Sequence, residues 1–480
     1  MTVYIVGLDG ATFDLIDRWE DDLPNLAELK EEGAYGELET VTPPITPAAW
    51  TSFMTGKNPG KHGIYDFSVK VRGEDNRFEL VSSGDIGTYT LYEYLNDQGL
   101  TTGSFNIPLT YPPLDIDGYI LSGGPVAEFG PHACRPEELW QELEALGGVR
   151  KETVTYTGDN PGAFVDSQHE QLADFERAFL HLMEERDEDL HAVLFQNTDN
   201  LAHWMWKYHD EDHPDHPAGN DHQDAIRDIY RRADEAVGKI RERMDEDDHL
   251  IIMSDHGFGG VHKSIYVNNL FHREGLLQFR RTPGTLLRRL LFRLGIDMEL
   301  ANRVGTRLGL KHRARKSQKK NDGDGGLLIR LVKSLLLSAD DIDWDRTKAY
   351  SRGNFGQVFL NEDLSGEERE RVKDRVREAL YGLEDPDTGK QVITDVLDRE
   401  ELYHGPETDR AADLVFMTRD MEYMPARHFE FGSRQVLSDA PVRNGHHRMN
   451  GIFYIAGPGI DGGTELDGLH ITDVAPTAIH

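Results

Sequence analysis

Short apolar runs and helical periodicities alternate along the chain. Apolar runs bounded by glycine or polar residues predict strands at residues 3–8, 102–107, 191–196, 249–254 and 451–456. Apolar residues spaced three or four apart predict helices at residues 15–33, 89–99, 174–186 and 224–244, and after Pro47. This alternation predicts an α/β fold with a mostly parallel central sheet.

Acidic and imidazole side chains follow the predicted strands. In an open α/β sheet, sites form beyond the carboxyl ends of the strands. The residues that follow these strands, or precede the last one, are Asp9, Asp199, His203, Asp255, His256, His446 and His447. Taken singly, each has an ordinary alternative, such as a helix cap for Asp9 or a surface loop for an Asp-His pair. Their recurrence at corresponding strand ends favours one common site.

The chemistry of these side chains suits a divalent metal ion. Carboxylate oxygen and imidazole nitrogen are ligands of zinc and manganese. Asp199 and His203 are four residues apart, which places both on one face of a helical turn. Asp255 and His256 are adjacent, so a turn at a strand end can direct both towards one ion.

Thr46 lies in the stretch TPPITPAAW, just before a predicted helix. Threonine is a favoured N-cap and Pro47 fits the first helical turn, so a structural role is open. A helix N-terminus also binds phosphate through its free N–H groups. A threonine hydroxyl beside a metal ion becomes a usable nucleophile. The two roles are compatible.

One segment departs from the acidic character of the chain. Residues 280–320 contain thirteen lysines and arginines but two acidic residues. Leucines interleave with arginines over residues 286–294, a pattern typical of a basic helix that contacts a membrane surface or a partner. The alternative is that the segment docks on the acidic body of its own chain. We expect an inserted basic helical segment or lid at 276–343, between catalytic-domain segments 1–275 and 344–480.

Composition narrows the class of protein. The net charge is −34, which disfavours binding to nucleic acid and to anionic membranes. Such an acidic excess is typical of adaptation to a very salty cytoplasm, where salt screens the repulsion. We see no signal peptide before the first strand and no stretch close to the ~18 apolar residues that span a bilayer. We therefore expect a soluble, cytoplasmic protein; the sequence does not define its oligomeric state.

Five ordered stretches carry a family resemblance: VGLDG, TPPITPAAWTSFMTGKNPGKHGIYDF, QNTDNLAHW, IIMSDHGF and GHHRMNGIF. Together they resemble the alkaline phosphatase superfamily, specifically its type I phosphodiesterase and nucleotide pyrophosphatase branch. The nearest resemblance is to its uncharacterised prokaryotic phosphohydrolase or phosphomutase-like proteins. It implies an alkaline-phosphatase-like three-layer sandwich with an inserted helical subdomain. It also implies a metal-dependent hydrolase of small phosphate esters.

The resemblance further implies two divalent metal ions, with zinc favoured over manganese. The ligands would be Asp199, His203 and His447 for one ion, and Asp9, Asp255 and His256 for the other. Thr46 would bridge to the second ion as nucleophile, forming a phosphothreonine that water hydrolyses. Asn106, at another strand end, is the candidate phosphate ligand.

Some residues depart from the family pattern. Ala48 and Ala49 stand where better-known diesterases have Asn-His. The stretch ITPAAW lacks the cysteine or serine pattern of sulfatases, which disfavours sulfate esters. Two other functions stay open: a phosphomutase of the same fold, which would free no phosphate, and a non-catalytic scaffold that binds a membrane or partner.

Overall fold

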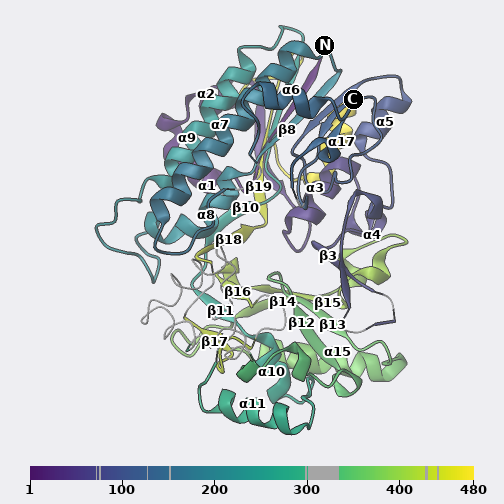
Figure 1. Cartoon of the computed structure of the whole chain (residues 1–480), viewed down its shortest axis with the longest axis vertical. Helices are drawn as coiled ribbons and strands as arrows, with labels where there is room; N and C mark the ends of the chain where they lie inside the picture. The colour runs from purple at the N-terminus through teal and green to yellow at the C-terminus, as the bar shows by residue number, and fades with distance from the viewer. Residues whose placement is uncertain are drawn as a thin grey trace.

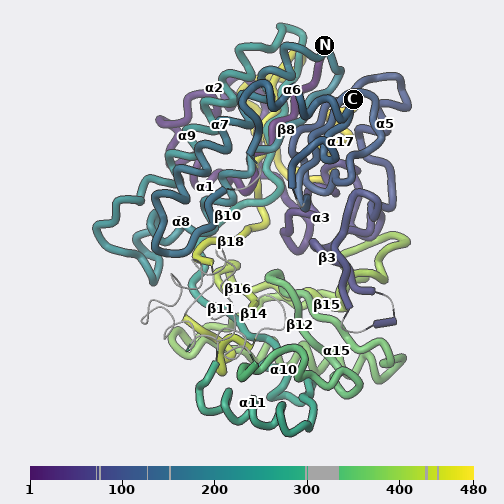
Figure 2. Tube along the Cα trace, viewed as in Figure 1, coloured from purple at the N-terminus to yellow at the C-terminus, as the bar shows by residue number. Residues whose placement is uncertain are grey.

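The computed structural model of the chain describes residues 1–71, 73–74, 77–126, 128–150, 153–297, 300, 334–426, 431–439 and 443–480. The chain forms two halves stacked along its long axis (Figure 1). The upper half contains a large sheet flanked by helices, and the lower half contains smaller sheets. Both ends of the chain lie in the upper half, so the chain enters the lower half and returns (Figure 2).

A ten-stranded sheet in the described part of the chain organises the upper half. Its order is β20-β2-β19-β9-β1-β8-β5-β6-β7, with β21 also paired to β2. The strands are β1 (Val3–Leu8), β2 (Ala34–Glu39), β5 (Thr102–Phe105), β6 (Gly118–Leu121), β7 (Cys134–Arg135), β8 (Leu190–Phe195), β9 (His249–Met253), β19 (Asn450–Ala456), β20 (Thr464–Glu465) and β21 (Leu469–His470). Central β1 is parallel to both neighbours, with Leu8 opposite Phe195 and Gly7 opposite Met253. The chain segments that leave these strands therefore meet at one edge.

Helices cover both faces of this sheet, which makes three layers. One face carries α1 (Phe13–Ile16), α2 (Pro24–Glu32), α6 (Leu139–Ala145), α7 (Pro161–Glu185), α8 (Asn197–His209) and α9 (Ala225–Arg241). The other carries α3 (Thr46–Thr55), α4 (Pro59–His62), α5 (Leu91–Asp97) and α17 (Val474–Ile479). Each face encloses its own apolar core. The three-layer sandwich with a mostly parallel sheet is thus confirmed.

Close packing between β1 and α3 positions the candidate nucleophile. Trp50 of α3 is fully buried, and a Cβ at Gly7 would lie 2.5 Å from its Cη2 atom. Glycine at position 7 therefore lets α3 lie directly on β1. Burial of a large apolar side chain contributes about 1.5–3 kcal/mol, which fixes the helix against the strand. Thr46, at the start of α3, is held near the end of β1 as a consequence.

The local prediction for residues 15–33 was wrong in one respect. The structure has α1, then a 3-10 helix at Asp17–Asp22, then α2, in place of one continuous helix. Pro24 starts α2, and proline lacks the N–H needed inside a helix. Two short helices satisfy the same apolar spacing because both pack on one core.

The lower half has a separate core around an antiparallel sheet of order β12-β13-β15-β14. Its elements are β11 (Lys263–Ile265), α10 (Val267–Arg273), α11 (Pro283–Arg293), β12 (Ala349–Arg352), β13 (Gln357–Leu360), α15 (Gly366–Tyr381), β14 (Ile393–Asp398), α16 (Arg399–Leu402), β15 (Leu414–Thr418), β16 (Tyr423–Pro425) and β17 (Leu437–Ser438). This core reaches from Ile265 to Val436, on both sides of the expected insertion. The boundaries 276 and 343 stay a prediction, and residues 298–299 and 301–333 lie outside the described residues.

Two antiparallel strand pairs link the halves. The first is β3 (Ser68–Lys70) with β4 (Phe78–Leu80), and Phe78 packs edge-on against Phe359 of the lower sheet. The second is β10 (Gly257–Gly260) with β18 (Gly445–Arg448), which continues into β19. None of the helices in the described ranges combines the length and apolarity that a membrane crossing needs.

Candidate active site

The strand ends of the upper half bring the expected acidic and imidazole side chains together. Asp9 follows β1, Asp255 and His256 follow β9, Asp199 and His203 lie on α8 after β8, and His446 and His447 lie on β18. All are buried or nearly so. Their ligand atoms form three overlapping groups, each within 4.8 Å: Asp9, Asp255 and His256; Asp199, His256 and His447; His203, His446 and His447.

Several oxygen and nitrogen atoms of this cluster that could bind a metal ion are buried without a hydrogen-bond partner among the described residues. They are Asp9 Oδ1, Asp199 Oδ1, Asp255 Oδ2 and His256 Nε2. His256 Nε2 lies 3.3 Å from Asp255 Oδ2 and 3.6 Å from Asp9 Oδ1. An unpaired buried polar atom costs about 1–3 kcal/mol, so several at one point mark a place for a binding partner. Oxygen and nitrogen donors that converge in this way fit a divalent cation.

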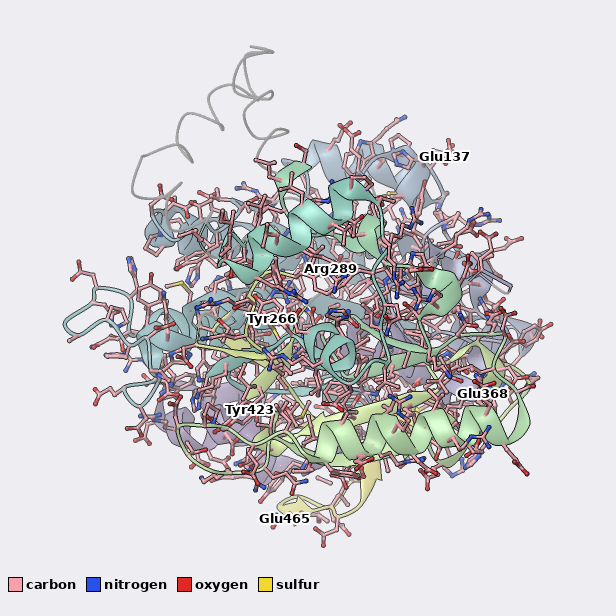
Figure 3. The ribbon with its side chains drawn as sticks, turned by 90° about the horizontal axis from the view of Figure 1, so that it is seen from below. Glu137, Tyr266, Arg289, Glu368, Tyr423 and Glu465 are labelled. Atoms are coloured by element: carbon pink, nitrogen blue, oxygen red, sulfur yellow. The ribbon has the colours of Figure 1, made fainter. Side chains whose placement is uncertain are left out.

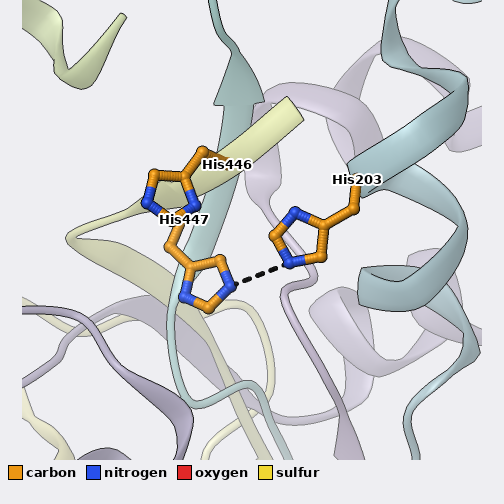
Figure 4. Close-up of side chains that lie close together, drawn as sticks. All are labelled: His203, His446 and His447. Carbon is orange, nitrogen blue, oxygen red and sulfur yellow. Dashed lines mark hydrogen bonds between the residues drawn. The ribbon is translucent and has the colours of Figure 1, made fainter. Parts of the chain in front are cut away.

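The histidine rings are oriented by backbone carbonyls. Nδ1 of His203 lies 2.8 Å from Gly445 O, Nδ1 of His256 lies 2.9 Å from Gly257 O, and Nδ1 of His447 lies 2.7 Å from Pro44 O. A carbonyl only accepts, so each Nδ1 donates and each Nε2 carries a lone pair, which in His203 accepts from Arg443 Nη1 at 2.8 Å. Nε2 of His203 and of His447 lie 3.2 Å apart (Figure 4). Facing lone pairs of this kind suit a shared cation.

Burial favours the neutral form of the His203 and His256 imidazoles. The pKa of His203 is well below its usual value because the ring is buried and Arg443 and His447 lie nearby. The pKa of His256 is also well below its usual value, again through burial and then through His447. Neutral imidazole is the form that binds a metal ion. These histidines are therefore ready to act as ligands at neutral pH.

The carboxyl groups show the opposite shift where they lie side by side. Burial, followed by the charges of Asp255 and Asp199, raises the pKa of Asp9 well above its usual value. Burial raises the pKa of Asp255 to about 8. For Asp199, burial raises the pKa but contact with His447, 3.3 Å away, outweighs it and lowers the pKa. A nearby cation would offset the repulsion between the first two carboxyl groups.

Thr46 is the first residue of α3, and the N-cap position belongs to Ile45. The N-cap interpretation of Thr46 is therefore wrong by one residue, with Pro47 second in the helix. Thr46 is half-buried and lines a cavity of about 400 Å³ together with Asp9, Asp199, His203 and His447. The structure thus places the hydroxyl-bearing residue beside the candidate metal ligands.

The cavity lies between the two halves, and residues that sequence reasoning missed complete its wall. Arg352 and Asn354, from the β12–β13 hairpin, line it from below, and Arg443 lines it beside the imidazoles. Arg443 Nη1 lies 2.8 Å from His203 Nε2. Position close to the GHH motif is a signal that could have indicated Arg443. Arg352 has no comparable signal, because it lies in another half of the chain.

Arg352 is held by an aromatic ring. Its guanidinium carbon lies 3.5 Å from the ring centroid of Phe78. Burial lowers its pKa, and the charge of nearby Asp66 acts in the opposite direction. A guanidinium group keeps its charge in proteins because its usual pKa lies far above neutral pH. A fixed cation therefore faces the cavity opposite Thr46 and the candidate metal ligands.

Asn106, the candidate phosphate ligand, does not line this cavity. It follows β5 in a left-handed conformation (φ 64°) and is buried. Its amide Nδ2 donates to the carbonyl oxygen of Leu194 at 3.1 Å, and it is not among the residues that line the cavity. The side chain ties the end of β5 to β8. We therefore do not include Asn106 among the substrate ligands proposed below.

Glycine at position 445 sets the position of the histidine pair. A Cβ there would lie 2.5 Å from the carbonyl oxygen of Ala202 and 2.6 Å from Phe258 Cε1. The absence of a side chain lets β18 lie directly on α8, where Gly445 O accepts from His203. His447 follows two residues later on the same strand, so both imidazoles face one point.

The fold and the buried cluster define an α/β protein of the alkaline phosphatase superfamily. The model of the type I phosphodiesterase / nucleotide pyrophosphatase family matches residues 3–435, so the chain belongs to that family. The chain is therefore a phosphoesterase, and the superfamily that the sequence resemblance implied is confirmed. No curated protein matches the sequence.

Solved structures share the fold at low sequence identity. Phosphonoacetate hydrolase from Sinorhizobium meliloti 1021, in complex with phosphonoformate, matches with a TM-score of 0.59 and 14% identity, over 100% of this chain and 95% of that one. Human ectonucleotide pyrophosphatase / phosphodiesterase 5 (ENPP5) matches with a TM-score of 0.55 and 13% identity, over 100% and 94%. An inactive variant of murine ENPP5 in complex with AMP matches with a TM-score of 0.54 and 12% identity, over the same shares.

Proposed function

We propose that this phosphoesterase is a two-metal phosphodiesterase or nucleotide pyrophosphatase with Thr46 as its nucleophile. The observation that carries the proposal is the set of unpartnered, buried donor atoms of Asp9, Asp199, Asp255 and His256 beside Thr46 in one cavity. Murine ENPP5 supports the role of threonine, because its inactive variant carries alanine in place of a threonine.

The family resemblance assigns the roles, and the convergence of these side chains supports them. Asp199, His203 and His447 would hold one metal ion, and Asp9, Asp255 and His256 the other, beside Thr46. Ions held there would supply positive charge for the oxygens at phosphorus and would make the Thr46 hydroxyl easier to deprotonate. Thr46 Oγ1 attacks phosphorus, the ester oxygen leaves with a proton, and water then hydrolyses the phosphothreonine. The free N–H groups at the start of α3 stabilise the charged phosphoryl oxygens.

A substrate panel with metal analysis tests the proposal. Purified protein is expected to carry divalent metal, and zinc or manganese should support release of nitrophenol from bis-nitrophenyl phosphate. The panel also contains nitrophenyl phosphate, a nucleoside triphosphate, phosphonoacetate and labelled phosphosugars. Hydrolysis of none of these esters by the metal-loaded protein would contradict the proposal. Transfer within a phosphosugar without free phosphate would favour a phosphomutase.

Arg352 is expected to bind the part of the substrate that leaves or stays remote from phosphorus. Its guanidinium lines the cavity but is not one of the clustered donors. Arg352→Ala should therefore raise KM about tenfold and change kcat little, which is the pattern of lost uniform binding. Steady-state kinetics on the best ester measures this.

The control is Arg346→Ala, at an exposed position of the lower half outside this cavity. It should leave both constants unchanged, and Arg352→Lys should restore part of the affinity. A fall in kcat as large as that of a nucleophile variant, with KM unchanged, would exclude this role of Arg352.

A further inference from the structure

A second cavity, in the lower half, is lined by arginines. It has a volume of about 480 Å³ and lies beside α10 and α11. The basic residues in its wall are His272, Arg273, Arg289, Arg293 and Arg434, and none of the aspartates or glutamates in the described ranges lines it. Seen from below, Arg289 lies between α10 and α11 (Figure 3). The chain as a whole has a net charge of −34. The active-site cavity has no comparable concentration of positive charge among its lining residues in the described ranges.

The four guanidinium groups lack acidic partners. Across the described ranges, none of them forms an ion pair with a carboxylate. Arg289 Nη2 lies 3.4 Å from Nε2 of His272, and Arg273 donates to the backbone oxygen of Arg434 at 3.2 Å. By contrast, Arg288 on the same helix binds Asp341, with Nε 2.9 Å from Oδ2.

The positive charges around Arg289 lie close enough to affect one another. The pKa of Arg289 is lowered by burial and then by Arg293 and Arg281. Like charges without counterions repel, and a bound anion removes that cost. The volume of the cavity falls within the roughly 300–1,000 Å³ range of small-molecule sites. Phe279 and Phe292 supply an apolar wall.

We propose that this cavity binds a phosphate-bearing anion with at least two negative charges. The guanidinium fork matches the geometry of phosphate oxygens, which favours phosphate over a single carboxylate. The site shares no lining residue with the active-site cavity. An anion bound here is therefore a second ligand, separate from the substrate, or a regulator of the activity at the first cavity. Binding weakens as salt rises, because the interaction is electrostatic.

Two sources could supply this anion: a free polyphosphate or the headgroup of an anionic phospholipid. The outward face of α11 carries Leu286, Leu287 and Leu290, each about half exposed (50%, 51% and 53%). Its arginines at 288 and 289 face the body of the protein instead. Apolar side chains at the surface beside a basic cavity fit a lipid headgroup, so both sources enter the test.

The test uses the full-length, metal-loaded protein with Arg289→Gln and Arg293→Gln combined. Titration with inorganic pyrophosphate at constant ionic strength should show, apart from any binding at the active-site cavity, one site whose affinity falls at least tenfold in this double variant. Hydrolysis of bis-nitrophenyl phosphate should be unchanged. The double variant should also melt no lower than wild type without pyrophosphate, which separates lost binding from lost folding.

The matched control combines Arg346→Gln with Arg371→Gln, which removes two positive charges outside the cavity. It should bind pyrophosphate as wild type does. Sedimentation with phosphatidylcholine vesicles, with and without phosphatidylglycerol, identifies the source. If wild type and the control bind the anionic vesicles and the cavity variant does not, the ligand is a lipid headgroup. If wild type binds pyrophosphate but not the vesicles, the ligand is a free anion. Equal binding of both probes by the cavity variant and wild type, or equal loss in the control, overturns the proposal.

Discussion

Replacing Thr46 with alanine is expected to lower phosphate-ester hydrolysis by at least about 10³-fold while metal content stays at the wild-type level. The reason is position: Thr46 begins α3 and lines the cavity that also contains Asp9 and His447. Removing the hydroxyl removes the proposed acceptor of the phosphoryl group but leaves the clustered acidic and imidazole ligands. Steady-state kinetics and metal analysis on the same preparation measure the two quantities.

Thr55→Ala is the matched control in the same helix. The hydroxyl of Thr55 donates to the carbonyl oxygen of Thr51 at 2.7 Å and has no place in the cavity. This variant should keep wild-type activity. Thr46→Ser should keep part of the activity, because serine supplies a hydroxyl at the same atom position. If Thr46→Ala hydrolyses the ester as fast as wild type, Thr46 is not the nucleophile.

Chelation is expected to abolish hydrolysis and to lower the melting temperature, and zinc or manganese should restore both. A ligand present at a thousand times its dissociation constant stabilises the folded state by about 4 kcal/mol. The carboxyl groups of Asp9 and Asp255 lie together in a buried site, where a bound cation lets both ionise without uncompensated repulsion. Calorimetry of the metal-loaded and metal-free protein measures the change.

The variant Asp255→Asn separates metal binding from the cost of burying charge. Without metal, it should be more stable than wild type, because one buried carboxyl group is gone. With metal, it should be less stable, because a ligand is gone. Asp234→Asn is the control: Asp234 is also buried but accepts from Asn25 and Leu26, away from the cluster. Asp234→Asn should lower the stability of the metal-loaded and the metal-free protein equally. A variant of Asp255 that behaves like the control would rule out metal binding there.

Sequence reasoning reached the candidate ligands because they follow strands. Apolar runs at residues 3–8, 191–196 and 249–254 correspond to β1, β8 and β9, which are adjacent in the sheet. Parallel neighbours end at the same edge, so side chains just after them converge. Asp9 and Asp255 could thus be grouped from local pattern alone. Their assignment as metal ligands is still a proposal, which the chelation experiment tests.

Other parts of the site depend on contacts between distant segments. Arg352 reaches the cavity through the packing of β12 in the lower half, and Phe78 comes to it from a hairpin of the upper half. Asn106 also follows a strand, yet its side chain bonds to Leu194 and misses the cavity. Whether a side chain reaches the cavity depends on the residues that pack around it in the fold, and not on its place in a motif.

The orientation of helix α11 also could not be predicted from the sequence. Its leucine and arginine pattern was readable, but the pattern could not tell which face turns inward. In the structure Arg288 pairs with buried Asp341, while Leu286 and Leu290 face outward. The part of the basic segment in residues 301–320 lies outside the described residues. Membrane or partner contact through 280–320 stays a prediction.

The sequence by itself determined the alternation of strand and helix, the family and the grouping of acidic and imidazole residues at strand ends. These follow from local apolar spacing and from ordered motifs, which need no knowledge of the fold. Only the tertiary structure decided which atoms are buried without partners, which arginines face the two cavities and which way α11 turns. Those features arise from packing between segments hundreds of residues apart, and burial and distance are properties of the folded chain alone.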